Sequence, residues 1–312
     1  MTKKGKRLKQ KQVKRMLKKL TNRVYYMDHV QETDRPALGL ICGDSYSLIV
    51  DAGNSPAHAK EFLQKASELD IQPIKYVTIT HWHWDHTFGM DAMGGLAISH
   101  RGTKKKLGYM KELKWDDASL DSRVEKGEET PFCRDMIKAE MPTRHGLKLM
   151  TPDIIFDDKI EIDLGGITCV VQHVGGGHAE DSSIIYVPEE KVLFLGDCLC
   201  EDYHSGPPSY DHNEFKKLID KIKHYDADHY VTSHHVPETH EEFWGYFQDL
   251  AEIGDIVREE LSFEKALEKL RVIRQSEPDE DQKGSILSFV NGNEKRANKK
   301  AVTGETAASL QE

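Results

Sequence analysis

The sequence predicts an α/β protein in which strands and helices alternate along most of the chain. Short apolar runs rich in β-branched residues, such as residues 74–80, are typical of buried strands. Between such runs lie segments with apolar residues at helical spacing, such as residues 56–69. The second half then repeats the strand-rich start of the first half. These three observations favour β-sheets that are covered by helices.

The individual elements follow in order along the chain. Residues 22–53 are predicted as a run of strands, and residues 56–69 as a helix with Phe62 on its apolar face. The strand at residues 74–80 is followed by the alternation of strand and helix. The later elements are predicted as two or three strands within 154–173, a hairpin at 183–195 that turns at Pro188, and helices at about 212–224, 238–254 and 263–274.

Length and composition indicate one large enzyme domain with a basic arm and a polar tail. A chain of 312 residues can bury a sizeable core. It has no apolar run of about eighteen residues and no signal-peptide pattern, and its five cysteines read as reduced thiols, so we expect a cytoplasmic protein. The expected parts are an arm at 1–20, a domain at 21–275, and a tail at 276–312 that is polar enough to be partly disordered.

The N-terminal arm differs in charge from the rest of the chain. Residues 1–20 carry ten Lys or Arg and no acid, which leaves 33 basic against 53 acidic residues in the remainder. Four apolar residues of the arm, Val13, Met16, Leu17 and Leu20, follow helical spacing. A helix of this kind can contact nucleic acid, an anionic lipid surface or the acidic body of a partner subunit, or it can be solvated or docked on its own chain. The sequence leaves open whether the protein forms a homo-oligomer.

The segment from Thr80 to His86 (THWHWDH) places three histidines and an aspartate within six positions. In extended backbone that leaves the preceding strand, His81 and His83 point to the same side. Asp85 and His86 follow where the chain can turn into a short helix, so they can face a second point in space. Imidazole nitrogen and carboxylate oxygen suit zinc, iron, manganese or cobalt. The motif therefore predicts two pairs of metal ligands.

With this HxHxDH motif and four others in the same order, the chain resembles the metallo-β-lactamase superfamily. Upstream, a strand ends in Asp-x-Gly at Asp51. Downstream, a glycine-rich turn precedes His178, and two further strands end at Asp197 and His234. The resemblance spans residues 48–234. It implies a four-layer αβ/βα sandwich (the metallo-β-lactamase fold), with the metals at the edge of the two sheets.

The same resemblance implies a ligand set and a count of ions. Two divalent metal ions are expected, with zinc as the first choice and manganese or iron as alternatives. Asp51 is implied to orient one of the metal-binding histidines from behind. Carried over residue by residue, the implied ligands are His81, His83 and His178 for one metal, Asp85, His86 and His234 for the other, and Asp197 as the bridge between them.

The activity implied by the resemblance is metal-dependent hydrolysis. Two cations that share a water molecule lower its pKa, which supplies a nucleophile near neutral pH, and they stabilise negative charge that develops on the substrate. Asp85 is implied to orient that nucleophile and to act as the catalytic carboxylate. Because Cys198 stands one place after the position of the cysteine ligand of β-lactam-hydrolysing members, we expect a small ester, lactone, thioester or amide as substrate.

Two alternatives of other kinds stay open from the sequence. A phosphodiesterase or nuclease of the same fold is favoured by the basic arm. A mononuclear-iron oxygenase that acts on persulfides is the second alternative, because some members of the superfamily bind one iron with the first metal's ligands and keep the HxHxDH motif. Seven candidate ligands argue against a protein that has lost its metal.

Two segments without motifs are predicted to shape the substrate site. Residues 101–143 are charged and helical in pattern, which indicates an insertion that can cap the site. Residues 201–212 form a loop, by their Gly and Pro content, directly after the predicted bridging aspartate. Tyr203 and His204 in this loop are therefore candidate substrate residues. His235 is a third candidate, because in extended backbone its side chain points away from that of its metal-binding neighbour.

Overall fold

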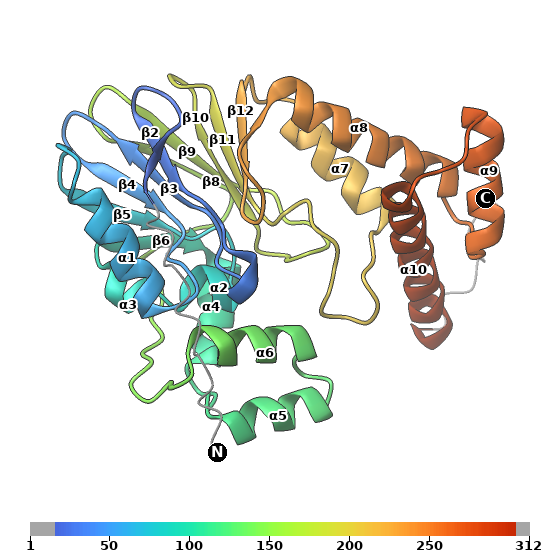
Figure 1. Ribbon diagram of the computed structural model, residues 1–312, viewed down its shortest axis with the longest axis horizontal. Coiled ribbons are helices and arrows are strands. Elements are labelled where there is room, and N and C mark those ends of the chain that lie inside the picture. The colour runs from blue at the N-terminus through green and yellow to red at the C-terminus, as the bar shows by residue number, and fades with distance from the viewer. Residues whose placement is uncertain (1–15, 304–312) are drawn as a thin grey trace, which may run out of the picture.

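The computed structural model describes residues 16–303, which form two β-sheets packed face to face with helices on both outer faces (Figure 1). One sheet has seven strands and the other has six. The predicted four-layer αβ/βα sandwich with a helical insertion is confirmed. None of the five cysteines forms a disulfide. Within residues 16–303, no helix is both long enough and apolar enough to cross a bilayer.

The seven strands of the first sheet lie side by side in chain order. Neighbours are antiparallel from β1 to β4 and parallel from β4 to β7. The outer face of this sheet is covered by α1 (Pro56–Ala66) and α3 (Met90–Met93). The strands are β1 (Lys18–Lys19), β2 (Val24–Met27), β3 (Leu38–Cys42), β4 (Ser47–Val50), β5 (Ile74–Thr78), β6 (Leu96–His100) and β7 (Ile154–Phe156).

The second sheet has the order β13-β12-β11-β10-β9-β8, and its only parallel pair within the described residues is β11 with β12. The predicted hairpin is present as β10 and β11. The outer face of this second sheet is covered by α7 (His212–Ile222) and α8 (His240–Val257). The strands are β8 (Lys159–Asp163), β9 (Thr168–His173), β10 (Ser183–Val187), β11 (Val192–Gly196), β12 (His229–Thr232) and β13 (Glu238–Thr239).

Alternation of side chains along each strand divides the core into three apolar layers. In β4, Leu48 and Val50 face the opposite sheet, whereas Ile49 faces α1. On the helix side, Phe62 of α1 is fully buried against the same layer. Burial of one such side chain contributes roughly 1.5–3 kcal/mol. The two sheets are therefore fixed against each other, and their strand ends have defined positions.

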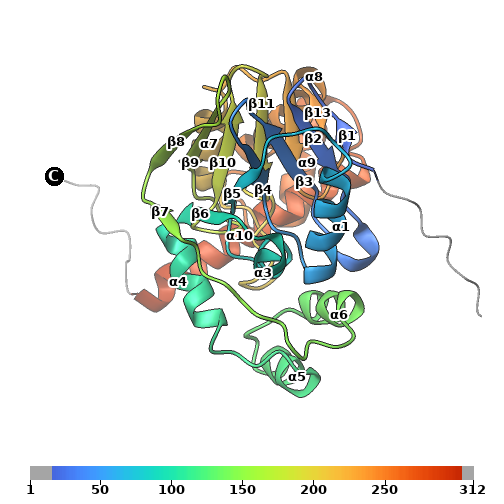
Figure 2. The same cartoon turned by 90° about the vertical axis from the view of Figure 1, so that its left-hand side faces the viewer.

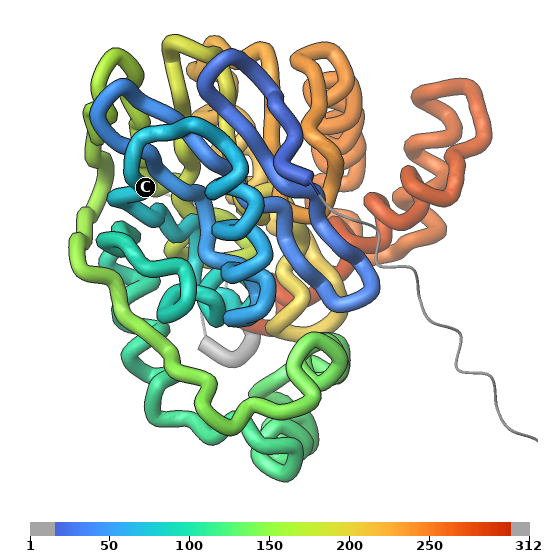
Figure 3. The backbone as a smooth tube through the Cα atoms, turned by 60° about the vertical axis from the view of Figure 1, so that its left-hand side comes forward, coloured from blue at the N-terminus to red at the C-terminus, as the bar shows by residue number. Residues whose placement is uncertain are grey.

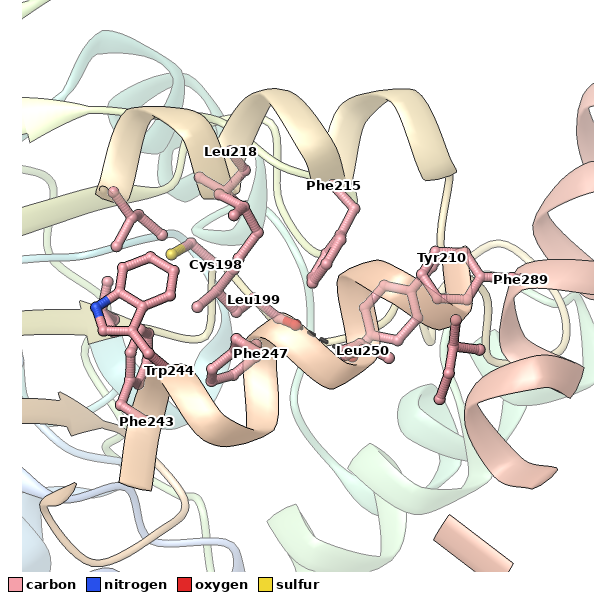
Figure 4. Close-up of a cluster of buried hydrophobic side chains, with 14 of the residues drawn as sticks. Cys198, Leu199, Tyr210, Phe215, Leu218, Phe243, Trp244, Phe247, Leu250 and Phe289 are labelled. Carbon is pink, nitrogen blue, oxygen red and sulfur yellow. Dashed lines mark hydrogen bonds between the residues drawn. The ribbon is translucent and has the colours of Figure 1, made fainter. Parts of the chain in front are cut away.

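The tail beyond Ser276 differs from its prediction, because residues Glu280–Thr303 form a long helix, α10. This helix packs on α8 and on α9 (Phe263–Arg274), at the end of the molecule opposite α1 in Figure 1, and Figure 3 traces the same segment in red. Phe289 is 1% exposed, and its ring lies 5.2 Å from that of Tyr210 (Figure 4). A few apolar side chains on one face are enough to hold a polar helix in place. Partial disorder is therefore wrong as a description of residues 280–303.

The predicted insertion at residues 101–143 is helical, as expected. It contains α4 (Arg101–Met110), α5 (Asp117–Glu125) and α6 (Pro131–Glu140), and the last two lie below the sheets in Figure 2. Trp115 packs its ring edgewise on Phe88, with centroids 4.7 Å apart. Thr130 accepts a hydrogen bond from the backbone of Cys133 and so caps the start of α6.

The end of the N-terminal arm also differs from its prediction. Residues 1–15 lie outside the described part, so the proposed arm is described only from Met16 onward. There the helical spacing does not produce a helix, because Lys18 and Lys19 form strand β1 and pair with Tyr26 and Tyr25. Hydrogen bonding to an available strand edge outweighs the weak helical pattern of so short a segment.

Candidate metal centre

The predicted site residues come from four neighbouring strand ends and one turn. His81 and His83 follow β5, and Asp85 and His86 lie in the short helix α2 (Trp84–Thr87). Trp84 is buried in the apolar layer under this helix. Because Trp84 anchors the segment, the side chains of His83, Asp85 and His86 are turned toward the edge of the sheets.

His81, His83 and His178 form one group, in which one donor atom of each lies within 4.8 Å of the others. Nε2 of His81 lies 3.0 Å from Nδ1 of His83. Burial lowers the pKa of both rings well below the usual range, which keeps them neutral. Nδ1 of His178 lies 2.9 Å from the backbone carbonyl oxygen of Glu201. Because a carbonyl only accepts, Nδ1 carries the proton and Nε2 presents a lone pair.

Asp85, His86, Asp197 and His234 form a second group within the same limit of 4.8 Å. Oδ2 of Asp85 lies 3.0 Å from Nε2 of His86 and 3.2 Å from Nε2 of His234. Burial opposes the charging of both imidazoles, but the surrounding carboxylates outweigh it and raise the pKa of each ring. In the same way, burial opposes ionisation of Asp85 and Asp197, but the imidazoles hold the pKa of each carboxyl well below its usual range.

Asp197 lies between the two groups. Its Oδ2 is 3.7 Å from Nε2 of His178 in the first group and 3.3 Å from Nε2 of His234 in the second. Its Oδ1 is buried and makes no hydrogen bond within the described residues, and the same is true of Nε2 of His178. Orphaned donor and acceptor atoms are rare inside proteins and call for a partner. Divalent cations suit this set of carboxylate oxygens and imidazole nitrogens.

Asp51 lies behind the second group, next to His86. It follows β4 with φ of 62°, is 1% exposed, and accepts a hydrogen bond from the backbone N–H of Thr80 at 2.8 Å. Its Oδ2 lies 2.8 Å from Nδ1 of His86. A carboxylate at this position holds the proton on Nδ1 and leaves Nε2 free to face the site. Gly196, at φ of 55°, passes so close that an added Cβ would lie 2.8 Å from the side chain of Thr80.

The three candidate substrate residues lie in different places. The ring centroid of His204 is 4.4 Å from that of His83, and the ring of Tyr203 is 6.2 Å from that of His178. Both residues therefore border the first group. His235 is exposed and is not part of either group, and its ring lies 6.4 Å from that of His29. Its predicted contact with substrate gains no support from this geometry.

The C-terminal helix α10 holds the loop that carries Tyr203 and His204. Ser288 of α10 donates a hydrogen bond to Glu201, whose other carboxylate oxygen accepts from the hydroxyl of Tyr203. Lys295 of α10 forms an ion pair with Asp202. The loop is therefore fixed at its start by a segment that the sequence analysis assigned to a polar tail.

Asp34 is a site residue that the sequence analysis did not identify. It follows the short helix η1 (Gln31–Thr33), and its Oδ1 lies 3.5 Å from Nδ1 of His234. Burial and then the charge of Asp85 raise the pKa of Asp34 to about 7. No motif marks this residue, because 200 positions separate it from the histidine that it contacts.

The segment that carries Asp34 is fastened to the insertion by its neighbour Arg35. Nε and Nη2 of Arg35 donate to Glu140 of α6 at 2.9 Å and 2.7 Å, and Nη1 donates to Glu61 of α1 at 2.8 Å. Glu140 also accepts from the hydroxyl of Ser55 at 2.6 Å. We call this arrangement of Arg35, Glu140, Glu61 and Ser55 the arginine clamp.

The chain matches a known family model over most of its two sheets. The family model for the metallo-beta-lactamase superfamily matches residues 37–235, which is more than half of the 312-residue chain. The matched segment contains the seven residues of the two groups.

Among curated proteins, the chain is 23% identical over 244 residues to the alkyl/aryl-sulfatase BDS1 of Saccharomyces cerevisiae, an alignment that covers 71% of this chain and 37% of that protein. It is 26% identical over 147 residues to the metallo-beta-lactamase type 2 of Bacteroides fragilis, which covers 46% of this chain and 45% of that protein. A linear primary-alkylsulfatase of Pseudomonas sp. is 24% identical over 216 residues, which covers 61% of this chain and 39% of that protein. The chain thus spans less than half the length of these curated relatives.

Solved structures show the same fold. The stereoselective inverting sec-alkylsulfatase Pisa1 from Pseudomonas sp. has a TM-score of 0.63 at 15% identity, and the superposition covers 95% of this chain and 51% of that chain. A metallo-beta-lactamase from Pontibacter korlensis has a TM-score of 0.53 at 20% identity and covers 75% of this chain and 97% of that chain. At these identities the similarity concerns the fold.

Proposed function

The chain belongs to the metallo-beta-lactamase superfamily. From this premise we propose that it is a hydrolase that binds two divalent metal ions, with zinc as the first choice of metal. The observation that carries the proposal is the position of Asp197. One of its oxygens faces imidazoles of both groups, while the other is buried without a hydrogen bond. A bridging ligand between two ions accounts for both features.

In this proposal the two groups hold one ion each. The donor atoms that face inward are imidazole nitrogens freed by hydrogen bonds on the opposite ring nitrogen, as in His178 and His86. The ligands proposed for the first ion are His81, His83 and His178, and those for the second are Asp85, His86 and His234, with Asp197 shared.

In this proposal, side chains of the protein orient the attacking water and transfer protons. When bound, a pair of divalent ions supplies a water of lowered pKa and an electrophilic contact for the substrate. Asp85 lies within hydrogen-bonding distance of two imidazoles of the second group, so its carboxylate is placed to orient that water and to pass a proton to the leaving group. Asp51 holds the ring of His86 in one orientation throughout.

The proposed substrate is a small ester, lactone, thioester or amide. Organic sulfate esters are a second candidate class, supported by two curated relatives named as alkyl- or arylsulfatases and by the alkylsulfatase fold that superposes on 95% of the chain. Beside the site, Lys106 stands over the ring of Trp82 at 5.2 Å. A cation at this place can pair with the negative charge that a sulfate ester carries.

The experiment that tests the proposal joins metal analysis to a substrate panel. Purified full-length protein should contain two zinc or manganese ions in its two groups and should hydrolyse one class among carboxylic esters, lactones, thioesters, β-lactams, alkyl sulfates and phosphodiesters. Asp197→Asn should lower both metal content and turnover. Full activity in that variant would refute the bridging role.

Metal analysis and one additional binding assay decide between the proposal and its alternatives. A single iron per chain together with oxygen consumption on a persulfide would replace the hydrolase by an oxygenase. For the nuclease, salt-dependent binding of RNA or DNA should vanish when residues 1–20 are removed. A cytoplasmic location, a homo-oligomer and contact of the arm with an anionic surface stay predictions.

A further inference from the structure

A third group of metal-ligand residues lies beside the two groups already described. It consists of Glu129, Cys133 and His204, and one donor atom of each lies within 4.8 Å of the others. Glu129 lies just before α6 of the insertion and Cys133 lies in its first turn, whereas His204 comes from the 201–212 loop. The group thus joins the two segments that border the mouth of the metal centre.

The carboxylate of this group is half-buried, and among the described residues the charge of Arg123 acts on it without a direct ion pair. Glu129 accepts a hydrogen bond from the neighbouring backbone N–H of Thr130 at 3.0 Å, and it has no ion pair with a Lys or Arg of the described residues. Burial raises the pKa of this carboxyl. A carboxylate removed from water needs a cationic partner or a metal.

The thiol is the second unusual member of the group. Cys133 is 8% exposed, and its side chain faces Glu129 and His204 rather than only the apolar residues around it. Thiolate, imidazole and carboxylate together form a donor set that zinc prefers, and three protein ligands leave a fourth position for water. Ordinary zinc–ligand distances require a small contraction of the group, which the exposed loop residue His204 can supply.

We propose that Glu129, Cys133 and His204 form a third cation site that takes zinc and fastens the insertion to the 201–212 loop. On binding, the thiol proton leaves to solvent and the sulfur takes its place in the coordination of the ion. The ring of His204 lies 4.4 Å from that of His83 and 6.3 Å from that of His178, measured between centroids. A filled third site therefore closes part of the entrance to the first group.

Cobalt(II) distinguishes this site from the other two by its spectrum. The seven residues of the two groups contain no sulfur, so a thiolate-to-cobalt charge-transfer band in the near ultraviolet reports a cysteine ligand. The full-length protein is stripped with a chelator and reloaded with cobalt(II) alone. The band should appear in the wild type, vanish in Cys133→Ser, and persist in Cys200→Ser, which changes another cysteine near Asp197.

Two further variants keep the test decisive. Cys133 is buried, so its replacement can disturb α6, and a second variant changes the exposed ligand instead. His204→Ala should weaken cobalt binding at the third site by at least about 10-fold. His83→Ala removes a ligand of the first group and should leave the band in place. A band that persists in that variant while hydrolysis is absent separates the third site from the proposed hydrolase. No band in the cobalt-loaded wild type, or a band that survives Cys133→Ser, overturns the proposal.

Discussion

The arginine clamp is predicted to contribute strongly to stability, and Glu140→Ala tests it. The side chains of Arg35 and Glu140 are 13% and 3% exposed, so their charges are largely removed from water. Loss of one partner of a buried pair typically costs 3–5 kcal/mol, because the remaining charge is left uncompensated. Here Glu61 stays 2.8 Å from Arg35 and retains part of the pairing. We therefore expect a loss of about 2–4 kcal/mol in the free energy of unfolding.

Equilibrium unfolding in urea measures this loss. For a chain of this size the free energy of unfolding falls by at least about 3 kcal/mol per molar urea, so the midpoint should fall by up to about 1.3 M. The matched control is Asp157→Ala, which breaks an ion pair with Arg101 whose side chains are 59% and 68% exposed. Exposed pairs contribute about 0–1 kcal/mol, so this control should shift the midpoint little.

The clamp also makes a second, local prediction. Arg35 adjoins Asp34, and the side chain of Asn54 donates to the backbone carbonyl of Thr33 at 2.8 Å, so the segment behind His234 is held from two sides. Glu140→Ala should therefore lower metal affinity in a chelator competition as well as stability. A Glu140→Ala variant that unfolds at the same urea concentration as Asp157→Ala would refute the assignment of the clamp as a buried ion pair.

Three further predictions follow from single positions. Asp51→Asn should lower metal affinity by roughly 10–100-fold in a chelator competition, and unchanged affinity would contradict its orienting role. Phe289→Ala should cost about 3–5 kcal/mol in urea unfolding, whereas Leu287→Ala, at 47% exposure on the same helix, should cost less than about 0.5 kcal/mol. Gly196→Ala should destabilise by more than about 1 kcal/mol because of its positive φ, while Gly245→Ala, with open space inside α8, should stabilise by about 0.5–1 kcal/mol.

The arrangement of the candidate metal centre could be predicted from the sequence because its residues are encoded locally. His81 to His86 follow one strand, and Asp197 directly follows another. A strand that ends in a fixed place delivers the next few side chains to a fixed edge, so a short motif is enough to anticipate their meeting. The structure brings all seven predicted ligands into two groups divided as the resemblance implied, with Asp197 between them.

Residues that support the centre from a distance carried no such signal. Asp34 reaches His234 through a loop, and Glu140 reaches Arg35 from the insertion. Each of these residues is an ordinary polar residue in its own segment. Only the packing of the two sheets and the insertion brings them together, and single-sequence patterns do not encode that packing.

Residues 280–303 of the tail and residues 16–20 of the arm were misread for opposite reasons. In α10, Ile286, Phe289 and Val290 recur at helical spacing but are outnumbered by polar residues, and average polarity hid them. At the end of the arm, helical spacing covered too few residues to outweigh the strand edge that β2 offers. A short apolar pattern is therefore informative when its partner surface is known, and misleading when it is read alone.

The segments proposed to shape the substrate site lack motifs, and one of them is restrained by the last described helix. Helix α10 holds Glu201 and Asp202 at the start of the loop, and the backbone carbonyl of Glu201 fixes the ring of His178. The last helix therefore reaches a proposed metal ligand through one residue. We therefore expect a change in α10 to alter both the proposed metal ligand His178 and the candidate substrate residues of the loop.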